Sequence, residues 1–204
     1  YAMPVTMGNE LSGIVTAVGS KVQRFHVGDE IYARLPLTKI GAFAEFVTID
    51  EQAVALKPKN LGFEHAAAVA LTGLTAYQGF KEELGAQPGQ SVMIPGGSGS
   101  FGQLAIPIAK ELGLKVMVSG NARGEETATA MGISQYFNYK KENYWEKLTP
   151  VDYVIDTIGK RELAHELSVL KPGGRLLSLR MGPNRRFAQD HQLSFAKTLL
   201  FSMA

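Results

Sequence analysis

Short apolar runs alternate with helical patterns through the second part of the chain. Runs typical of buried strands occupy residues 91–94, 115–119, 135–139, 151–156 and 175–179. An Ala-, Leu- and Ile-rich segment that ends at Gly113 separates the first two runs, and Leu163, Leu167 and Leu170 have helical spacing before Pro172. Strands that alternate with helices predict an α/β fold with a parallel, doubly wound sheet.

The first part of the chain has a different pattern. Residues 12–19, 28–33 and 41–49 form β-like runs separated by glycine and polar turns, which predicts an antiparallel, barrel-like or sandwich module. The pattern changes near Lys57-Pro58, after which residues 64–70 and 73–80 are predicted to be helical. We therefore expect two domains, residues 1–71 and residues 72–204.

A glycine turn follows the first buried strand of the second domain. Gly97 is expected to adopt a backbone conformation that a β-carbon would forbid, and Gly99 allows main-chain N–H groups to approach phosphate oxygens. Gly102 allows the next helix to pack close to its strand, and that helix directs its unpaired N–H groups at the same place. Because the surrounding βαβ unit spans about 30 residues, the turn predicts a site for a dinucleotide pyrophosphate.

The end of the next strand indicates which dinucleotide is bound. An NAD site usually offers Asp or Glu to the ribose hydroxyls about 20 residues after the glycines, whereas this chain has Ser119, Asn121 and Arg123. A carboxylate would repel a 2′-phosphate, while these three side chains can bind it, so NADP(H) is predicted as the cofactor. The alternative is that Arg123 is a solvated loop residue, and Glu125 and Glu126 nearby would weaken the preference for the 2′-phosphate.

Several motifs follow one another along the chain: Gly8-Asn9-Glu10-Leu11-Ser12-Gly13-Ile14-Val15, Val27-Gly28-Asp29-Glu30-Ile31, Gly41-Ala42-Phe43-Ala44-Glu45, Leu71-Thr72-Gly73-Leu74-Thr75-Ala76-Tyr77, the glycine turn and Leu170-Lys171-Pro172-Gly173-Gly174-Arg175. In this combination and order they resemble the medium-chain dehydrogenase/reductase superfamily, within it the zinc-independent quinone oxidoreductase and enone reductase branch. The resemblance runs from Met3 to about Leu200 and implies part of a GroES-like β domain followed by part of a Rossmann domain. Family chains are longer, so we expect a fragment that lacks both ends.

The resemblance also implies roles for individual residues. It implies that the segment from Ser98 through Gly99, Ser100 and Phe101 to Gly102 holds the pyrophosphate, and that Ser119, Arg123 and Tyr139 surround the adenosine ribose and its phosphate. Thr75 and Thr157 would lie near the nicotinamide end. From the residues alone, Thr75 could equally be a helix N-cap and Thr157 a strand terminus. No catalytic acid is assigned.

Composition argues against a metal centre. Zinc members of the superfamily bind the metal through cysteine and a histidine in a Gly-His-Glu motif, but this chain contains no cysteine and has Asn9 in the place of that histidine. Its four histidines, His26, His65, His165 and His191, are scattered singly, so no metal site and no Lewis-acid chemistry are expected.

The expected activity is therefore NADPH-dependent hydride transfer to a quinone or an α,β-unsaturated carbonyl. The alternatives are a catalytically silent nucleotide-binding homologue and an enoyl reductase module of a larger synthase. A net charge of +2 with interspersed signs, and the lack of an apolar run of about 18 residues, argue against nucleic-acid and membrane partners. We expect a cytoplasmic location, and the resemblance implies that the parent protein forms a homodimer.

Overall fold

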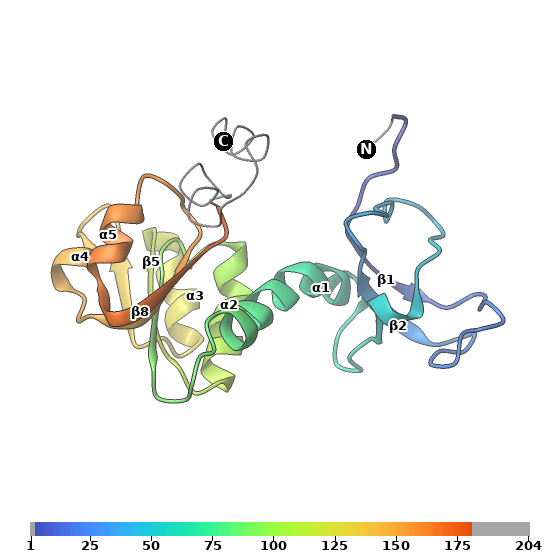
Figure 1. The fold of residues 1–204 in the computed structure, drawn as a ribbon, viewed down its shortest axis with the longest axis horizontal. Helices are drawn as coiled ribbons and strands as arrows, with labels where there is room; N and C mark the ends of the chain where they lie inside the picture. Colours follow the sequence, from blue (N-terminus) through green and yellow to red (C-terminus); the bar gives the residue numbers. More distant parts are fainter. Residues whose placement is uncertain (1–2, 181–204) are drawn as a thin grey trace, which may run out of the picture. The chain divides into compact units, whose positions relative to one another are not determined.

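The computed structural model describes residues 3–180, and the chain divides into two compact units, residues 1–82 and 83–204 (Figure 1). The expected domain boundary at residue 71 lies inside a helix of the first unit, α1, Phe63–Gln78. That helix unites the two helical segments predicted for residues 64–70 and 73–80, and it continues as a short π-helical segment, Gly79–Glu83.

The first unit contains an antiparallel sheet in the order β1-β2-β3. Its strands are β1, Glu10–Ile14, β2, Glu30–Arg34, and β3, Val54–Leu56, the last preceded by a 3₁₀ turn, Glu51–Ala53. Phe25, Ile31, Ala33 and Val54 form a buried apolar cluster at this sheet. The predicted antiparallel module is confirmed.

Two hydrogen bonds join helix α1 to strand β1. The Ser12 hydroxyl donates to the carbonyl oxygen of Phe63 over 2.5 Å, and the backbone N–H of Leu71 donates to a carboxylate oxygen of Glu10 over 2.8 Å. Polar side chains of the strand thus satisfy backbone groups of the helix that packs on it.

The prediction of a strand at residues 41–49 is wrong. This segment has no regular structure, and Phe43 and Phe46 are 76% and 74% exposed. Apolar character alone does not make a strand, because a strand also needs a neighbour for its backbone hydrogen bonds, and no described strand pairs with this segment.

The second unit is built on a five-stranded parallel sheet, so the predicted Rossmann-like fold is confirmed. Its strands have the order β6-β5-β4-β7-β8. They are β4, Ser91–Ile94, β5, Lys115–Gly120, β6, Gln135–Asn138, β7, Val151–Asp156, and β8, Leu170–Ser178. The order reverses between β4 and β7, and open α/β sheets bind their ligands beyond the carboxyl ends of the strands at such a switch point.

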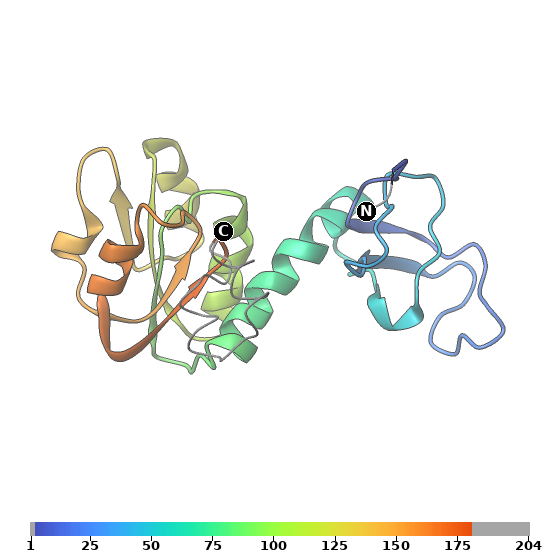
Figure 2. The same ribbon diagram turned by 45° about the horizontal axis from the view of Figure 1, so that its top comes forward.

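Helices cover both faces of this sheet. They are α2, Ser100–Glu111, α3, Glu125–Ala130 after a 3₁₀ turn at Ala122–Gly124, α4, Tyr144–Lys147, and α5, Leu163–Ser168. In Figures 1 and 2, α2 lies on one side of the sheet and α4 and α5 lie on the other. Because side chains alternate along a strand, each face has its own core.

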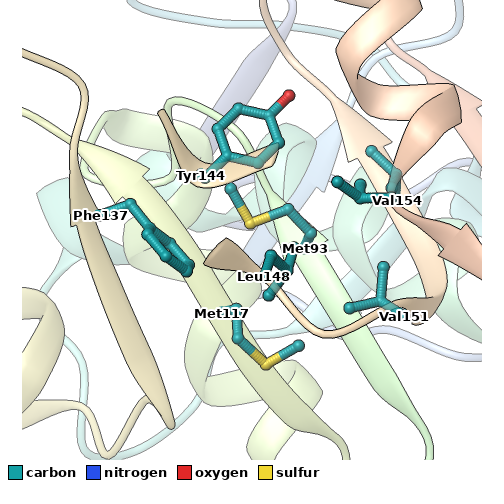
Figure 3. Close-up of a cluster of buried hydrophobic side chains, with 8 residues drawn as sticks. Met93, Met117, Phe137, Tyr144, Leu148, Val151 and Val154 are labelled. Atoms are coloured by element: carbon teal, nitrogen blue, oxygen red, sulfur yellow. The ribbon is translucent and has the colours of Figure 1, made fainter. Parts of the chain in front are cut away.

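The core beneath α4 and α5 brings together residues from four strands. Met93, Met117, Phe137 and Val154 come from β4, β5, β6 and β7, and Tyr144 and Leu148 cover them from α4 and its end (Figure 3). On the opposite face, α2 buries Ala105, Ile106 and Ala109. The sheet is thus sandwiched between apolar layers, which explains why its central strands β4, β5 and β7 are largely apolar.

Helix α5 buries a different face from the one that its leucine spacing predicts. The spacing of Leu163, Leu167 and Leu170 predicts that Leu167 faces the core, but Leu167 is 52% exposed and Glu166 is fully buried. The helix also ends earlier than the spacing predicts, at Ser168, and Pro172-Gly173-Gly174, the expected stop of the helix, lies inside strand β8, which begins at Leu170.

The amino ends of three strands are connected by polar side chains. Asp152 accepts hydrogen bonds from the backbone N–H and the hydroxyl of Ser91, over 2.8 and 2.7 Å, and pairs with the Lys171 ammonium at 2.9 Å. The Tyr153 hydroxyl donates to Gln90 over 2.7 Å. These contacts join β4, β7 and β8 at the end of the sheet opposite the glycine turn.

Within residues 3–180, no helix has both the length and the apolar character that a membrane span requires.

Candidate functional site

The glycine turn connects β4 to α2 at the switch point of the sheet. The glycine with a left-handed backbone is Gly96, whose φ is +70°, so the prediction that Gly97 supplies this conformation is wrong. Gly97 is required for packing instead, because a β-carbon there would lie 2.9 Å from both the Ile94 carbonyl oxygen and a methyl group of Val118. Both glycines let the chain turn sharply at the end of β4.

The start of α2 packs directly on this turn. A β-carbon at Gly102 would overlap the carbonyl group of Gly97 and lie 2.6 Å from the Gly97 Cα atom. Gly102 therefore permits a close approach of helix to turn, as predicted, although the contact is with the turn and not with the strand. Gly99 is the N-cap of α2 and has no side chain that could accept a capping hydrogen bond. The first N–H groups of the helix, near Ser100 and Phe101, therefore have no capping side chain as a partner.

Thr157 joins the two strands that flank the switch point. Its hydroxyl donates to the Pro95 carbonyl oxygen over 2.7 Å, and the position of a β-carbon on Gly96 would be 2.9 Å from the same hydroxyl. The loop after β7 therefore contacts the turn after β4 directly. Thr157 follows the end of β7, as predicted, and its side chain also supports the turn.

Asp156 fixes the loop that carries Thr157. This carboxylate is fully buried and accepts hydrogen bonds from the N–H groups of Ile158 and Gly159, over 2.7 and 2.6 Å, and from the Ser178 hydroxyl over 2.6 Å. Burial by itself raises the pKa of Asp156, but these hydrogen bonds outweigh it and lower the pKa below the usual range. Asp156 is thus ionised and holds the backbone of the loop.

Ser119 and Asn121 both support the backbone at the end of β5. The Ser119 hydroxyl is buried and accepts a hydrogen bond from the Gly96 N–H over 3.2 Å. Asn121 caps the 3₁₀ turn that follows, because its amide oxygen accepts from the N–H groups of Arg123 and Gly124, over 2.9 and 3.2 Å. The structure therefore gives each side chain a structural partner at the predicted ribose site.

Arg123 and Tyr139 are both exposed at the same edge of the sheet. Arg123 lies on the 3₁₀ turn after β5, and Tyr139 follows β6 with its side chain 57% exposed. The Tyr139 N–H donates to the Gly120 carbonyl oxygen over 3.2 Å, which places the two strand ends side by side. Both side chains are free to reach a ligand above the carboxyl ends of β5 and β6.

Tyr136 belongs to this site and was not found from the sequence. Its hydroxyl donates to the Asn121 carbonyl oxygen over 2.5 Å and is hydrogen-bonded to Ser98 of the glycine turn. Burial raises the pKa of Tyr136. The Ser98 side chain lies so close to Gly120 and Gly124 that a β-carbon on either glycine would overlap it. Tyr136 and Ser98 thus tie the glycine turn to the end of β5.

Thr75 lies in the first unit, in the last turn of α1. Its hydroxyl donates to the Leu71 carbonyl oxygen over 2.9 Å, one helical turn earlier. The alternative in which Thr75 is a helix N-cap is therefore wrong, because α1 begins at Phe63.

The histidines within the described residues do not form a metal centre. In residues 3–180, no group of three or more His, Asp or Glu side chains is arranged to hold a metal ion. His165 stacks on Trp145 with the ring centroids 3.6 Å apart, and His26 lies 3.9 Å from Asp29. His191 lies outside the described residues.

Two family models match the chain. The model for the alcohol dehydrogenase GroES-like domain matches residues 1–59, and the model for the zinc-binding dehydrogenase domain matches residues 101–201. The two matched segments correspond to the antiparallel sheet and to the parallel sheet from α2 onward.

Two individual relatives are named as a reductase and an oxidoreductase. The chain is 35% identical over 185 residues to a 2-methylene-furan-3-one reductase of Solanum lycopersicum, covering 87% of this chain and 47% of that protein. It is 30% identical over 185 residues to a quinone oxidoreductase of Mus musculus, covering 86% and 55%. The chain thus spans about half the length of these curated relatives.

A solved structure has the same fold. The Escherichia coli quinone oxidoreductase, crystallised in complex with NADPH, superimposes with a TM-score of 0.77 at 25% identity, covering 99% of this chain and 71% of that one.

Proposed function

Because the chain belongs to the medium-chain dehydrogenase/reductase superfamily, we propose that it binds NADPH and takes part in hydride transfer to a quinone or an α,β-unsaturated carbonyl without zinc. The observation that carries this proposal is the close approach of α2 to the glycine turn at Gly102. A pyrophosphate needs exposed backbone N–H groups at a helix N-terminus and no side chain in the way, and the turn offers both.

The chain's own residues supply binding and orientation. The backbone from Ser98 to Gly102 would hold the pyrophosphate, and Thr157, at the switch point beside Pro95, would lie near the nicotinamide. When bound, the coenzyme supplies the hydride, and the protein aligns it with an electron-poor carbon and excludes water. Thr75 stays a candidate for the same end of the coenzyme.

The preference for NADPH over NADH depends on Arg123. Arg123 is exposed on the 3₁₀ turn after β5, at the end of the sheet where the adenosine ribose is expected. An arginine can form two charge-assisted hydrogen bonds to a phosphate, whereas no carboxylate occupies the end of β5 to bind the ribose hydroxyls of NADH. The name of the Escherichia coli complex also includes NADPH, which supports the same choice.

The chemistry of the available donors argues against zinc. The superfamily's zinc sites use cysteine thiolates, and this chain has no cysteine. Asn9 stands at the position of the zinc-binding histidine, and a neutral amide is a poor zinc ligand. Hydride transfer to an activated double bond or a quinone ring needs no metal, because the acceptor carbon is already electron-poor.

Titration of the 204-residue chain with NADPH, NADH and 2′-phospho-AMP tests the coenzyme assignment. Arg123→Ala should weaken binding of NADPH and 2′-phospho-AMP, the two ligands with a 2′-phosphate, by about tenfold to a hundredfold, since a charge-assisted hydrogen bond contributes about 1.5–3 kcal/mol. NADH binding should not change. Lys115→Ala, which removes a cation at the opposite end of β5, is the matched control and should leave all three affinities unchanged.

Turnover tests the reaction. The protein should oxidise NADPH when a quinone or an enone is added. Equal binding of NADPH and NADH would refute the phosphate assignment, and tight NADPH binding without oxidation across a panel of acceptors would favour a catalytically silent nucleotide-binding protein.

A further inference from the structure

Glu166 is an unusual residue of the second unit because its carboxyl group is buried without a donor. The residue is fully buried on α5. Among the described residues, no N–H or O–H group donates a hydrogen bond to either of its side-chain oxygens. An ionised carboxylate in such a place is strongly disfavoured, because it loses its hydration and gains no compensating hydrogen bond.

The groups that face Glu166 make the ionised form still less favourable. It lies against the buried Asp156 carboxylate at the end of β7, and Glu162, just before α5, adds a second negative charge. Tyr144 of α4 is a neutral neighbour, and His165 on the same helix has its Nδ1 atom 3.6 Å from Glu162. Two carboxyl groups in contact are both satisfied when they share one proton, which then forms a hydrogen bond between them.

We propose that Glu166 is a positioning residue for the coenzyme site: its protonated carboxyl donates a hydrogen bond to Asp156 and thereby holds the loop of residues 157–159 against the glycine turn. Asp156 accepts hydrogen bonds from the N–H groups of Ile158 and Gly159 in this loop. The Thr157 hydroxyl in turn donates a hydrogen bond to the Pro95 carbonyl oxygen. As far as the coenzyme is concerned, this inference depends on the proposed function. The arrangement of the two carboxyl groups does not depend on it.

The consequence is a dependence on pH above neutrality. Burial, reinforced by the neighbouring Asp156, raises the pKa of Glu166 to about 8. Above that pH, Glu166 and Asp156 are both negative and repel each other, so the loop loses its anchor. If only the protonated form binds the coenzyme well, the dissociation constant of NADPH should increase by about tenfold between pH 7 and pH 9.

The test compares the wild-type chain with Glu166→Gln, whose amide can still donate to Asp156 but cannot lose a proton. NADPH affinity should fall above pH 8 in the wild type and stay constant in the variant. Glu146→Gln, the same change at an exposed site on α4, is the matched control and should keep the wild-type pH profile. Loss of affinity above pH 8 in Glu166→Gln as well, or its absence in the wild type, would overturn the proposal.

Two measurements without coenzyme separate this proposal from the proposed function. Amide hydrogen exchange at Ile158 and Gly159, corrected for its intrinsic pH dependence, should accelerate above pH 8 in the wild type but not in Glu166→Gln. A raised folded-state pKa also means that stability is lost as pH rises, so the wild-type Tm should fall relative to Glu166→Gln from about pH 5 to pH 8 and then level off. If NADPH fails to bind but both differences appear, the proposed function is wrong and the carboxyl pair stands; if neither appears, the pair is wrong.

Discussion

Replacing Gly102 with alanine tests the packing on which the candidate coenzyme site depends. The added methyl group would overlap the Gly97 carbonyl group, so the start of α2 must move away from the turn. The atoms in the way belong to the backbone, which cannot rotate aside as a side chain can. We therefore expect a loss of stability and a loss of coenzyme binding from the same substitution.

The magnitude follows from two opposing effects of Gly102→Ala. Inserting a methyl group into a well-packed site costs about 1–3 kcal/mol, and a clash with backbone belongs in the upper part of that range. Alanine is a better helix former than glycine by about 1 kcal/mol, which offsets part of the cost. The net loss is about 2 kcal/mol, which lowers the Tm of a chain of this size by roughly 4–8 °C.

Two other glycines provide comparisons. A methyl group at Gly99 would come no closer than 3.3 Å to the Gly96 carbonyl oxygen, so Gly99→Ala should change the Tm by about 1 °C or less while obstructing the approach of a phosphate. At Gly13, in β1, an added methyl group would meet no atom within 4 Å, and Gly13→Ala should affect neither property.

Thermal denaturation followed by circular dichroism, together with NADPH titration by fluorescence, measures both effects. Gly102→Ala should lose stability and binding, Gly99→Ala binding alone, and Gly13→Ala neither. The reasoning is refuted if Gly102→Ala melts within about 1 °C of the wild type and binds NADPH equally well.

Two further predictions concern stability. Burial alone would raise the pKa of Asp152, but hydrogen bonds from Lys171 and Ser91 bring it down to about 2, so the stabilisation is present above pH 4 and is lost as pH falls toward 2. Asp152→Asn should therefore cost about 1–2 kcal/mol at pH 7 and almost nothing at pH 2, measured by urea denaturation at each pH. Phe137→Ala should cost about 3–5 kcal/mol by the same assay, because the ring is 1% exposed in the core beneath α4; a loss below 1 kcal/mol would contradict that packing.

The parallel sheet could be predicted because its central strands, β4, β5 and β7, are largely apolar on both faces. Such runs stand out from the flanking turns, and the glycine turn marks where the first strand gives way to a helix. The elements that were missed are short or depend on context. Helix α4 has only four residues, too few to show a period. Strand β8 extends through Pro172, which a strand at the edge of the sheet formed by residues 3–180 tolerates.

The candidate site could be located from sequence more readily than its internal contacts could. The turn and Arg123 could be proposed because their positions after particular strands carry information, and Tyr139 was proposed from the family resemblance; the binding roles of both side chains stay predictions. Tyr136 and Glu166 were not found, because each acts through residues that are distant in the sequence or on another element, Ser98 for one and Asp156 for the other. Nothing in the local pattern distinguishes a buried glutamate from an exposed one on a short helix.

The polar contacts among Ser91, Asp152 and Lys171 have a consequence for how this domain could be altered. They cross-link the bottom rim of the sheet, whereas ligand recognition is expected at the top rim, beyond the opposite strand ends. Thermal stability and coenzyme specificity therefore depend on different residues. An engineer could strengthen the bottom rim to tolerate heat, and redesign the top rim to accept another coenzyme, with little conflict between the two.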